Sequence, residues 1–341
     1  MAKIFPLILW LCLASRMGVG KTTPLRIHLD WFPSIEFAGI LTALDKGWYR
    51  EEGLDVQPQF TGLEITDVIR NGGADIGMHS GHEVIRQIGR GATLKAFAAN
   101  YQFNPLTLIT PRSSPVLELK DFRGRTIGIF SDQEYDVLRV ILATAGLSLK
   151  DVKFKRLNTF KEIDLIEILK RKEVDGFLAW EFNWPITFTL QGYPVRQFPS
   201  HENGFHFYGI VFFAKPHFIT EHRKELATFL KVTARGWKEV YRDPSGYTKR
   251  IIAKWYPKDR YINGSETLTL KQQLLELKIM KRYLFEGVGE GNFGLMSRFK
   301  WERGIQIAKA NGLIPDDKRI TVDDVVDTSL YQENAQGMRG Q

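Results

Sequence analysis

The spacing of apolar residues alternates between two patterns along the first third of the chain. Runs that alternate apolar and polar residues are typical of strands, whereas apolar residues at intervals of three and four are typical of helices. Strands are predicted at residues 25–29, 54–60, 74–78 and 94–99, and helices at residues 35–46, 65–70 and 83–88. Strands that alternate with helices predict a parallel α/β sheet with helices on its faces.

A second alternation of the same kind follows an apolar strand predicted at residues 105–111. Its strands are predicted at residues 125–130, 152–156, 174–180 and 195–198, and its helices at residues 135–145 and 162–171. The unbroken apolar run GIVFFA at residues 209–214 predicts a buried strand that crosses back. Beyond about Ile219 the spacing is helical, through residues 226–240, 247–255, 268–285 and 296–310.

These two crossings predict an α/β protein of two lobes, joined by two crossover strands and separated by a ligand cleft. Lobe 1 is expected to comprise residues 21–105 and 212–332, and lobe 2 residues 106–211. The polar tail at residues 333–341 is predicted to be disordered. A length of 341 residues is ample for two cores of this kind.

Residues 1–20 are predicted to form an export signal. Lys3 supplies a positive charge, residues 4–14 are apolar, and small residues follow at a possible cleavage site. The apolar run is about half of the roughly 20 residues that a membrane-spanning helix needs, which favours cleavage over anchoring. The single cysteine, Cys12, lies inside this segment, and bulky Trp10 and Leu11 before it argue against lipid attachment. A mature chain without thiols excludes disulfides and thiolate metal sites.

The net charge of +8 is spread along the chain, with acidic and basic residues interspersed. A nucleic-acid-binding protein is expected to gather its basic residues into a patch, so we interpret the charge as a solvated surface. The segment GVGKTT at residues 18–23 resembles the end of a phosphate-binding loop, but Ser15 stands where that motif needs glycine. We therefore expect no cofactor and no nucleic-acid partner.

Candidate ligand-binding residues lie where predicted strands end, because ligands of α/β sheets bind beyond the carboxyl ends of the strands. The loop after the first strand carries Asp30, Trp31, Phe32, Ser34, Glu36 and Phe37. The loop after the strand ADIGM carries His79, Ser80 and Gly81. His79 and His82 could be metal ligands, ligand contacts or ordinary histidines, and Glu83 is the one carboxylate at suitable spacing. We predict a hydrogen-bonding ligand contact and no metal.

The strongest candidates in the second lobe follow the strand predicted at residues 174–180. Trp180, Glu181, Phe182, Asn183 and Trp184 place three aromatic rings, a carboxylate and an amide in five residues. Aromatic rings stack on planar ligands, and a carboxylate accepts hydrogen bonds from an exocyclic amine. The alternative is that the tryptophans pack the lobe and Glu181 is solvated. Glu134, Tyr135 and Tyr208 are weaker candidates, and Trp31 and Trp180 are expected to converge on one cleft.

Several segments resemble one known family in the same order. They are LDWFPSIEFAGILTALDKGWYREEGLDV at residues 29–56, GGADIGMHSGHEVIRQIGRG at 72–91, DFRGRTIGIF at 121–130, VDGFLAWEFNWP at 174–185, FLKVTARGWKEVYRDP at 229–244 and WERGIQIAKANGLI at 301–314. Together they resemble the NMT1/THI5-like periplasmic substrate-binding proteins, which recognise thiamine-type pyrimidines and are related to sulfonate and taurine binders. The resemblance implies a type II periplasmic binding protein fold and a monomer that delivers a small ligand to an ABC transporter permease.

The chain departs from the pattern of the pyrimidine binders at two places. Those proteins commonly have an asparagine and a histidine in the loop that here contains Ser34 and Glu36, and a glutamate where this chain has Trp184. Glu36 and Glu181 could replace these groups, or the ligand could differ. The enzyme alternative is the related pyrimidine synthase, which uses pyridoxal phosphate held by a lysine and a cysteine-rich motif. His79 stands at the lysine position and cannot form a Schiff base. A ligand-sensing module for a membrane partner would share the fold.

Overall fold

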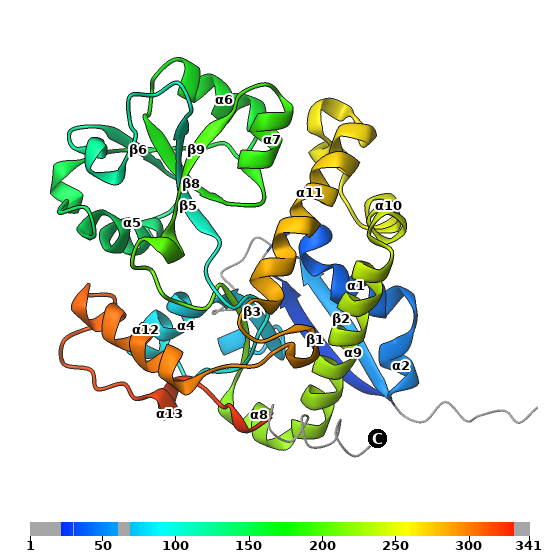
Figure 1. The fold of residues 1–341 in the computed structure, drawn as a ribbon. Coiled ribbons are helices and arrows are strands. Elements are labelled where there is room, and N and C mark those ends of the chain that lie inside the picture. Colours follow the sequence, from blue (N-terminus) through cyan, green and yellow to red (C-terminus); the bar gives the residue numbers. More distant parts are fainter. Residues whose placement is uncertain (1–21, 30, 61–68, 331–341) are drawn as a thin grey trace, which may run out of the picture.

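The chain folds into two five-stranded sheets, each covered by helices (Figure 1). The computed structural model describes residues 22–29, 31–60 and 69–330. The predicted export signal at residues 1–20, the predicted tail at residues 333–341, Asp30 and most of the predicted helix at residues 65–70 lie outside the described residues. Within the described part, no helix is both long enough and apolar enough to cross a membrane.

The first sheet has the strand order β2-β1-β3-β10-β4. Its strands are β1 (Thr23–Leu29), β2 (Leu54–Phe60), β3 (Ile76–Ser80), β4 (Lys95–Ala99) and β10 (Ile210–Ala214). Strand β1 is parallel to β2 and β3, whereas β10 is antiparallel to β3 and β4. The apolar run that predicted a returning buried strand is β10, and all five of its residues are buried.

The second sheet repeats this arrangement in the order β7-β6-β8-β5-β9. Its strands are β5 (Leu106–Pro111), β6 (Thr126–Ile129), β7 (Lys153–Arg156), β8 (Gly176–Trp180) and β9 (Val195–Pro199). Here β5 is the antiparallel strand, lying between β8 and β9. Each crossover strand is therefore inserted antiparallel into an otherwise parallel sheet, and the alternating strands are parallel to one another as predicted. A crossover strand enters from the opposite lobe, which reverses its direction.

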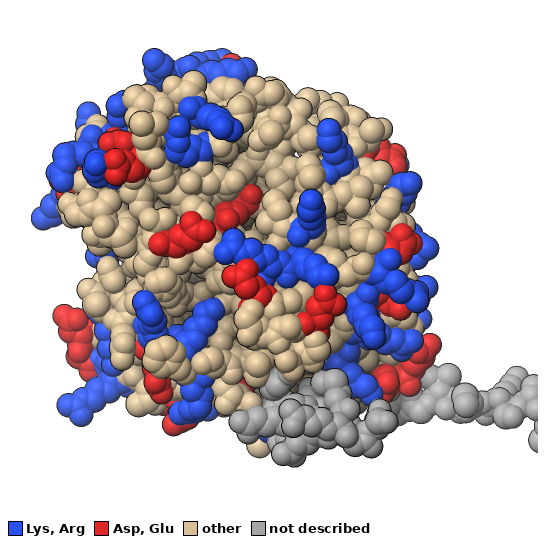
Figure 2. Space-filling view, viewed as in Figure 1, with Lys and Arg blue, Asp and Glu red and all other residues tan. Residues whose placement is uncertain are grey.

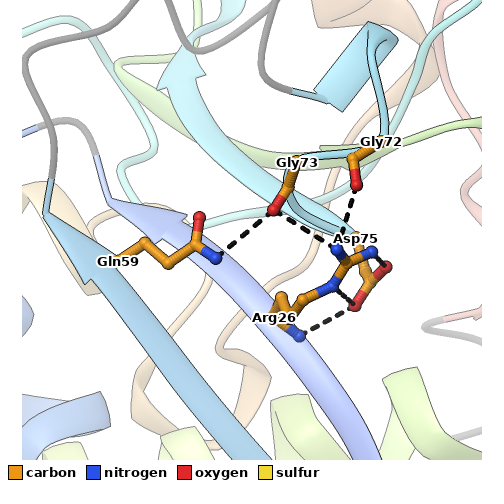
Figure 3. A network of polar contacts seen from close by, with 5 residues as sticks. All are labelled: Arg26, Gln59, Gly72, Gly73 and Asp75. Carbon is orange, nitrogen blue, oxygen red and sulfur yellow. Dashed lines mark hydrogen bonds and ion pairs between the residues drawn. The ribbon is translucent and has the colours of Figure 1, made fainter.

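In each sheet an aspartate hydrogen-bonds two neighbouring strands together: β1 with β3 in the first sheet, and β6 with β8 in the second. The backbone N–H of Arg26 donates to the Asp75 carboxylate over 2.9 Å, and its guanidinium holds the same carboxylate over 2.6 Å (Figure 3). In the second sheet, the backbone N–H of Thr126 donates to Asp175 over 2.9 Å. An aspartate directly before β3 or β8 thus holds that strand beside β1 or β6 in the two lobes.

The helices lie on the faces of the sheets and on the side of the first lobe. They are α1 (Ala38–Asp45), α2 (Trp48–Glu51), α4 (Gly81–Gly89), α5 (Glu134–Ala143), α6 (Glu162–Lys170), α7 (Trp184–Leu190), α8 (Pro216–Glu221), α9 (Arg223–Arg242), α10 (Pro244–Lys254), α11 (Glu266–Phe285), α12 (Arg298–Ala310) and α13 (Val322–Val325). Helix α7 was not predicted. It begins at Trp184, and Pro185 occupies its first turn, where the missing N–H has no intrahelical partner to lose.

Helices α1 and α9 approach each other closely in the core of the first lobe. A Cβ atom at Gly236 would lie 1.9 Å from the carbonyl oxygen of Gly39. Only two glycines facing each other allow this approach, which packs Trp237 against Gly39. This contact therefore holds the first turn of α1 against α9.

The two chain segments that connect the sheets run side by side. The N–H of Gly209 donates to the carbonyl of Tyr101 over 3.1 Å, and the N–H of Tyr101 donates to Ile210 over 2.9 Å. Nearby, the N–H of Glu181 donates to Pro105 over 2.9 Å. The connection between the lobes is therefore a short paired ribbon rather than two free linkers.

Candidate functional site

A cleft between the two lobes brings together aromatic and polar residues from both. Its lining consists of Trp31, Phe32, Phe160, Glu162, Asn183, Trp184, Thr187, Tyr256, Arg260, Ile262 and Gln272. The empty space in the cleft is about 320 Å³ when its open mouth is included. Its enclosed cavity volume is only about 10 Å³, so the side chains of the cleft nearly fill it.

The first lobe contributes a group of rings from the loop after β1 and the turn after α10. The rings of Trp31 and Phe32 are 5.2 Å apart, and Tyr256 meets Phe32 edge to face at 5.5 Å. Trp31 is 37% exposed, which is high for a tryptophan and leaves its ring at the mouth of the cleft. Burial, followed by the nearby charge of Glu276, raises the pKa of Tyr256 above its ordinary value, so its hydroxyl stays protonated.

The second lobe contributes a stack of rings at the ends of its strands. Phe160 lies against Phe130 with ring centres 5.0 Å apart, and Trp184 lies 5.2 Å from Phe130. Phe160 also meets Trp31 edge to face at 6.1 Å, across the boundary between the lobes. Aromatic side chains of the two lobes therefore contact each other across the cleft.

Gln272 of α11 lines the cleft, and a row of buried polar side chains on α11 continues behind it. The amide of Gln273 donates to Gln272 and to Glu276, each over 2.7 Å. The Gln273 oxygen accepts from the backbone N–H of Ile35 over 2.9 Å, which ties α11 to the turn before α1. Asn183, from the second lobe, also stabilises the charged form of Glu276 by hydrogen bonding. The row thus connects both lobes to the floor of the site.

Three carboxyl groups, those of Glu36, Glu162 and Glu276, lie in or behind the cleft lining. Burial, and then the neighbouring charge of Glu36, raises the pKa of Glu276 well above its ordinary value. Burial likewise raises the pKa of Glu162, although the positive charge of Arg260 opposes this change. Among the described residues, no group of three acidic or histidine side chains is arranged to hold a metal ion. The carboxylates are therefore arranged around the cleft rather than converging on one point.

The residues predicted from the first loop fall into two groups. Trp31 and Phe32 line the cleft, while Ser34, Glu36 and Phe37 are buried beneath it. The Ser34 hydroxyl accepts from the N–H of Glu36 over 3.3 Å and caps the short turn before α1.

His79 and Ser80, which were predicted to follow the strand, are the last two residues of β3, and Gly81 begins α4; none of them belongs to the cleft lining. The Ser80 hydroxyl lies 2.6 Å from Nδ1 of His82 and accepts from Asn104 over 2.8 Å. Burial lowers the pKa of His82 to about 3, so its ring is neutral. The ring of His79 accepts from the N–H of Ser80 over 2.7 Å, and Gly81 donates its N–H to the carbonyl of Tyr208 over 3.1 Å. This network joins β3 to the connection between the lobes.

Trp180, the last residue of β8, and Glu181, which follows it, lie at the connection between the lobes rather than in the cleft lining. Trp180 packs edge to face against Tyr101 and Phe182, at 6.2 and 5.5 Å. Oε1 of Glu181 lies 3.1 Å from Nδ1 of His201, and both side chains are largely buried. Trp31 and Trp180 were expected to converge on one cleft. Trp31 lines the cleft and contacts Phe160 of the second lobe, whereas Trp180 is not part of the lining. Asn183 lies in the cleft lining as placed by sequence.

The weaker candidates lie near the aromatic stack or behind it. Glu134 accepts from the N–H of Phe130 over 3.2 Å, and burial of its carboxyl group raises its pKa to about 8. Tyr135 packs against Phe154 at 4.8 Å. The Tyr208 hydroxyl accepts from the N–H of Ser297 over 2.7 Å, which ties the connection to the start of α12.

Sequence reasoning missed the residues that the C-terminal helices bring to the cleft. These are Tyr256, Arg260, Ile262, Gln272, Gln273 and Glu276. One signal was present, because Gln272, Gln273 and Glu276 occupy a helix face that also carries Leu277 and Met280, where apolar residues are expected. Buried polar residues on an otherwise apolar face indicate a site or a network. No comparable signal marks Arg260.

Comparison with solved structures shows that the chain has the fold of the periplasmic binding proteins. The alkanesulfonate-binding protein SsuA from Xanthomonas axonopodis pv. citri, bound to MOPS, is 16% identical; the match covers 90% of this chain and 99% of that one, with a TM-score of 0.66. The nitrate-binding protein NrtA from Synechocystis PCC 6803 is 14% identical; the match covers 94% and 90%, with a TM-score of 0.65. At these identities the likeness shows the fold alone.

The sequence itself shows the family. Residues 34–246 match the family described as NMT1/THI5 like, so the chain belongs to this family, as its motifs indicated. The riboflavin-binding protein RibY of Chloroflexus aurantiacus is 25% identical over 177 residues, which are 50% of this chain and 49% of RibY. The chain thus spans about half the length of the curated relative that it matches.

Proposed function

We propose that this protein is an exported solute-binding protein that captures a small planar nitrogen heterocycle, such as a thiamine-related pyrimidine, between its lobes and delivers it to an ABC transporter permease. The single observation that carries the proposal is the pairing of aromatic rings across the cleft, where Trp31 of the first lobe meets Phe160 of the second at 6.1 Å. Rings on both sides of one space suit a flat ligand, because each ring stacks on a face or edge of the guest.

The polar groups of the cleft support a ligand rich in hydrogen-bond donors. Glu162, Asn183 and Gln272 place acceptor oxygens in the lining, and Glu276 lies directly behind Gln272. A heterocycle with an exocyclic amine would present donors to these oxygens. The fold and the family support delivery to a permease. We propose that residues 21–105 and 212–332 form one lobe and residues 106–211 the other. The working form would be a monomer in the periplasm.

An enzymatic function of the pyridoxal phosphate type is less well supported by the site. His79, at the position of the expected lysine, uses a ring nitrogen to accept from the N–H of Ser80. The neighbouring Ser80 and His82 are buried and hydrogen-bonded to each other, so they do not face the cleft. A binding function needs no reactive group and agrees with these contacts.

The test is calorimetry on the chain purified from residue 21 onward. We expect saturable binding of a 4-aminopyrimidine or of riboflavin at micromolar or lower concentration, and weaker or no binding of ethanesulfonate and nitrate. Trp184→Ala should weaken the heterocycle binding at least fivefold without lowering the melting temperature by more than a few degrees. A protein that binds none of these heterocycles, or binds them equally well after Trp184→Ala, would contradict the proposal.

A further inference from the structure

Arg260 places its guanidinium inside the aromatic cleft. This residue ends the short turn Lys258–Arg260, which follows α10, and it belongs to the cleft lining. Its Cζ atom lies 5.0 Å from the centre of the Phe32 ring. The other two residues of the turn, Lys258 and Asp259, are exposed, whereas Arg260 is half-buried. The side chain thus lies against the cleft although the surrounding turn faces solvent.

The surroundings of this guanidinium are those that proteins use to hold planar cations. Phe32 presents its ring to the positive charge, and Trp31 and Tyr256 flank Phe32 at 5.2 and 5.5 Å. The negative face of an aromatic ring attracts a cation, and the attraction is larger where water is excluded. Glu162, in the same lining, interacts electrostatically with Arg260.

The charges around the cleft favour a positive guest over a negative one. Within the described cleft lining, Arg260 is the one basic side chain and Glu162 the one acidic side chain. Behind the lining, Glu276 and Glu36 add two more carboxyl groups close to each other. Once Arg260 leaves the lining, Glu162 is its one remaining charged side chain. The negative charge of Glu162 would repel an anion in the cleft. A cation would pair with this carboxylate and so lower the cost of burying it.

The remaining space decides how such a guest could bind. The enclosed cavity volume of the cleft is only about 10 Å³, which is enough for about one water molecule. A planar ligand has no room beside Arg260 in this arrangement. It would have to take the position of the guanidinium, while the exposed turn lets Arg260 move outward to solvent.

We infer that the cleft selects a ligand with a planar, positively charged nitrogen group, such as an amidinium or a protonated amino-heterocycle, and that the Arg260 guanidinium occupies the place of that group. The inference rests on the proposed binding function and adds the charge of the ligand to it. Arg260 competes with the ligand for the Phe32 ring and Glu162, and therefore sets the affinity. Sulfonates and nitrate, which structurally similar proteins bind, are excluded by charge.

Three probes of nearly equal shape separate charge from shape. Benzamidinium, benzamide and benzoate are a planar cation, a neutral molecule and an anion, and calorimetry at constant ionic strength compares their affinities. We expect benzamidinium to bind at least tenfold more tightly than benzoate, with benzamide between them. Glu162→Gln should weaken the binding of benzamidinium at least fivefold and change the affinity for benzamide by less than twofold.

The competition is tested by Arg260→Ala, which should strengthen benzamidinium binding severalfold. Lys258→Ala is the matched control, since it removes the same charge from the same turn outside the cleft, and it should change the affinity less than twofold. Melting curves show whether each variant is folded.

The outcomes separate this inference from the proposed function. Benzoate or benzamide binding as tightly as benzamidinium, or benzamidinium binding that weakens in Arg260→Ala, would overturn the selection of a cation and leave the binding function standing. Absence of binding by all three probes and by neutral heterocycles would overturn both. Equal gains from Arg260→Ala and Lys258→Ala would show an overall charge effect and overturn the competition.

Discussion

The rings of Trp31 and Phe160 meet edge to face across the lobe boundary, at 6.1 Å between their centres. One ring follows the first strand of the first sheet, and the other precedes α6 of the second sheet. Phe160 is 44% exposed, and Trp31 is 37% exposed, so neither ring belongs to a lobe core. Side chains that remain accessible while touching each other across two lobes form a contact that can separate and re-form as the lobes move.

Phe160→Ala should weaken heterocycle binding about three- to tenfold, because an aromatic contact contributes about 0.5–1.5 kcal/mol beyond its buried area. The measurement is calorimetry with a heterocycle that binds the unchanged protein. Phe299→Ala is the control, since Phe299 is 71% exposed on α12, and we expect no change in affinity. Equal losses in both variants would argue against a specific role of the lobe contact.

Trp180→Ala should lower stability more than affinity, in contrast to Trp184→Ala. Trp180 packs on Tyr101 and Phe182 beside the connection, so its removal leaves a cavity that costs about 3–5 kcal/mol in a typical core. Because Trp180 is only partly buried, we expect the lower part of that range. Denaturant unfolding of both variants, together with calorimetry, gives the comparison. A Trp180→Ala protein of normal stability that no longer binds would place Trp180 in the site instead.

Glu134 should make stability fall as pH rises through the neutral range. Burial raises its pKa in the folded protein to about 8, above the ordinary value of 4.5 in the unfolded chain. Between these values the folded state holds a proton that the unfolded state has lost. The contribution of Glu134 to the free energy of unfolding is therefore fully present below about pH 4.5. It is lost as the pH rises towards 8, at up to about 1.4 kcal/mol per pH unit.

Glu134→Gln provides the control for this pH effect, because glutamine resembles the protonated carboxyl group and does not titrate. The difference in unfolding free energy between the variant and the unchanged protein should grow in favour of the variant from pH 5 to pH 8. Urea unfolding at four pH values measures it. A constant difference across this range would show that Glu134 ionises normally.

Gly236→Ala should destabilise the first lobe by several kcal/mol or prevent folding. The added Cβ would lie 1.9 Å from the carbonyl oxygen of Gly39, so α1 and α9 would have to separate. Gly291→Ala is the matched control, since a Cβ there meets nothing within 4 Å, and its effect should stay within about 0.5 kcal/mol. Thermal unfolding of the two variants tests the difference.

The sequence by itself determined the elements of each lobe and the family. Apolar spacing located the strands and most helices, because the periods of two and 3.6 residues depend only on local geometry. The unbroken run at residues 209–214 identified the returning strand β10, since a strand buried on both faces needs no polar alternation. The corner after β1 also followed from sequence, because a loop after a strand lies at the edge of its sheet.

The tertiary structure decided which side chains meet in the cleft. Trp180 is the last residue of β8 and Trp184 the first of α7, and only the turn between them sets which ring faces the other lobe. The unpredicted helix α7 is the reason that Trp184, rather than Trp180, lines the cleft. Arg260 and Gln272 reach the same space from the C-terminal helices. Their position depends on packing between residues far apart in the chain, such as Gln273 against Ile35, which no local pattern encodes.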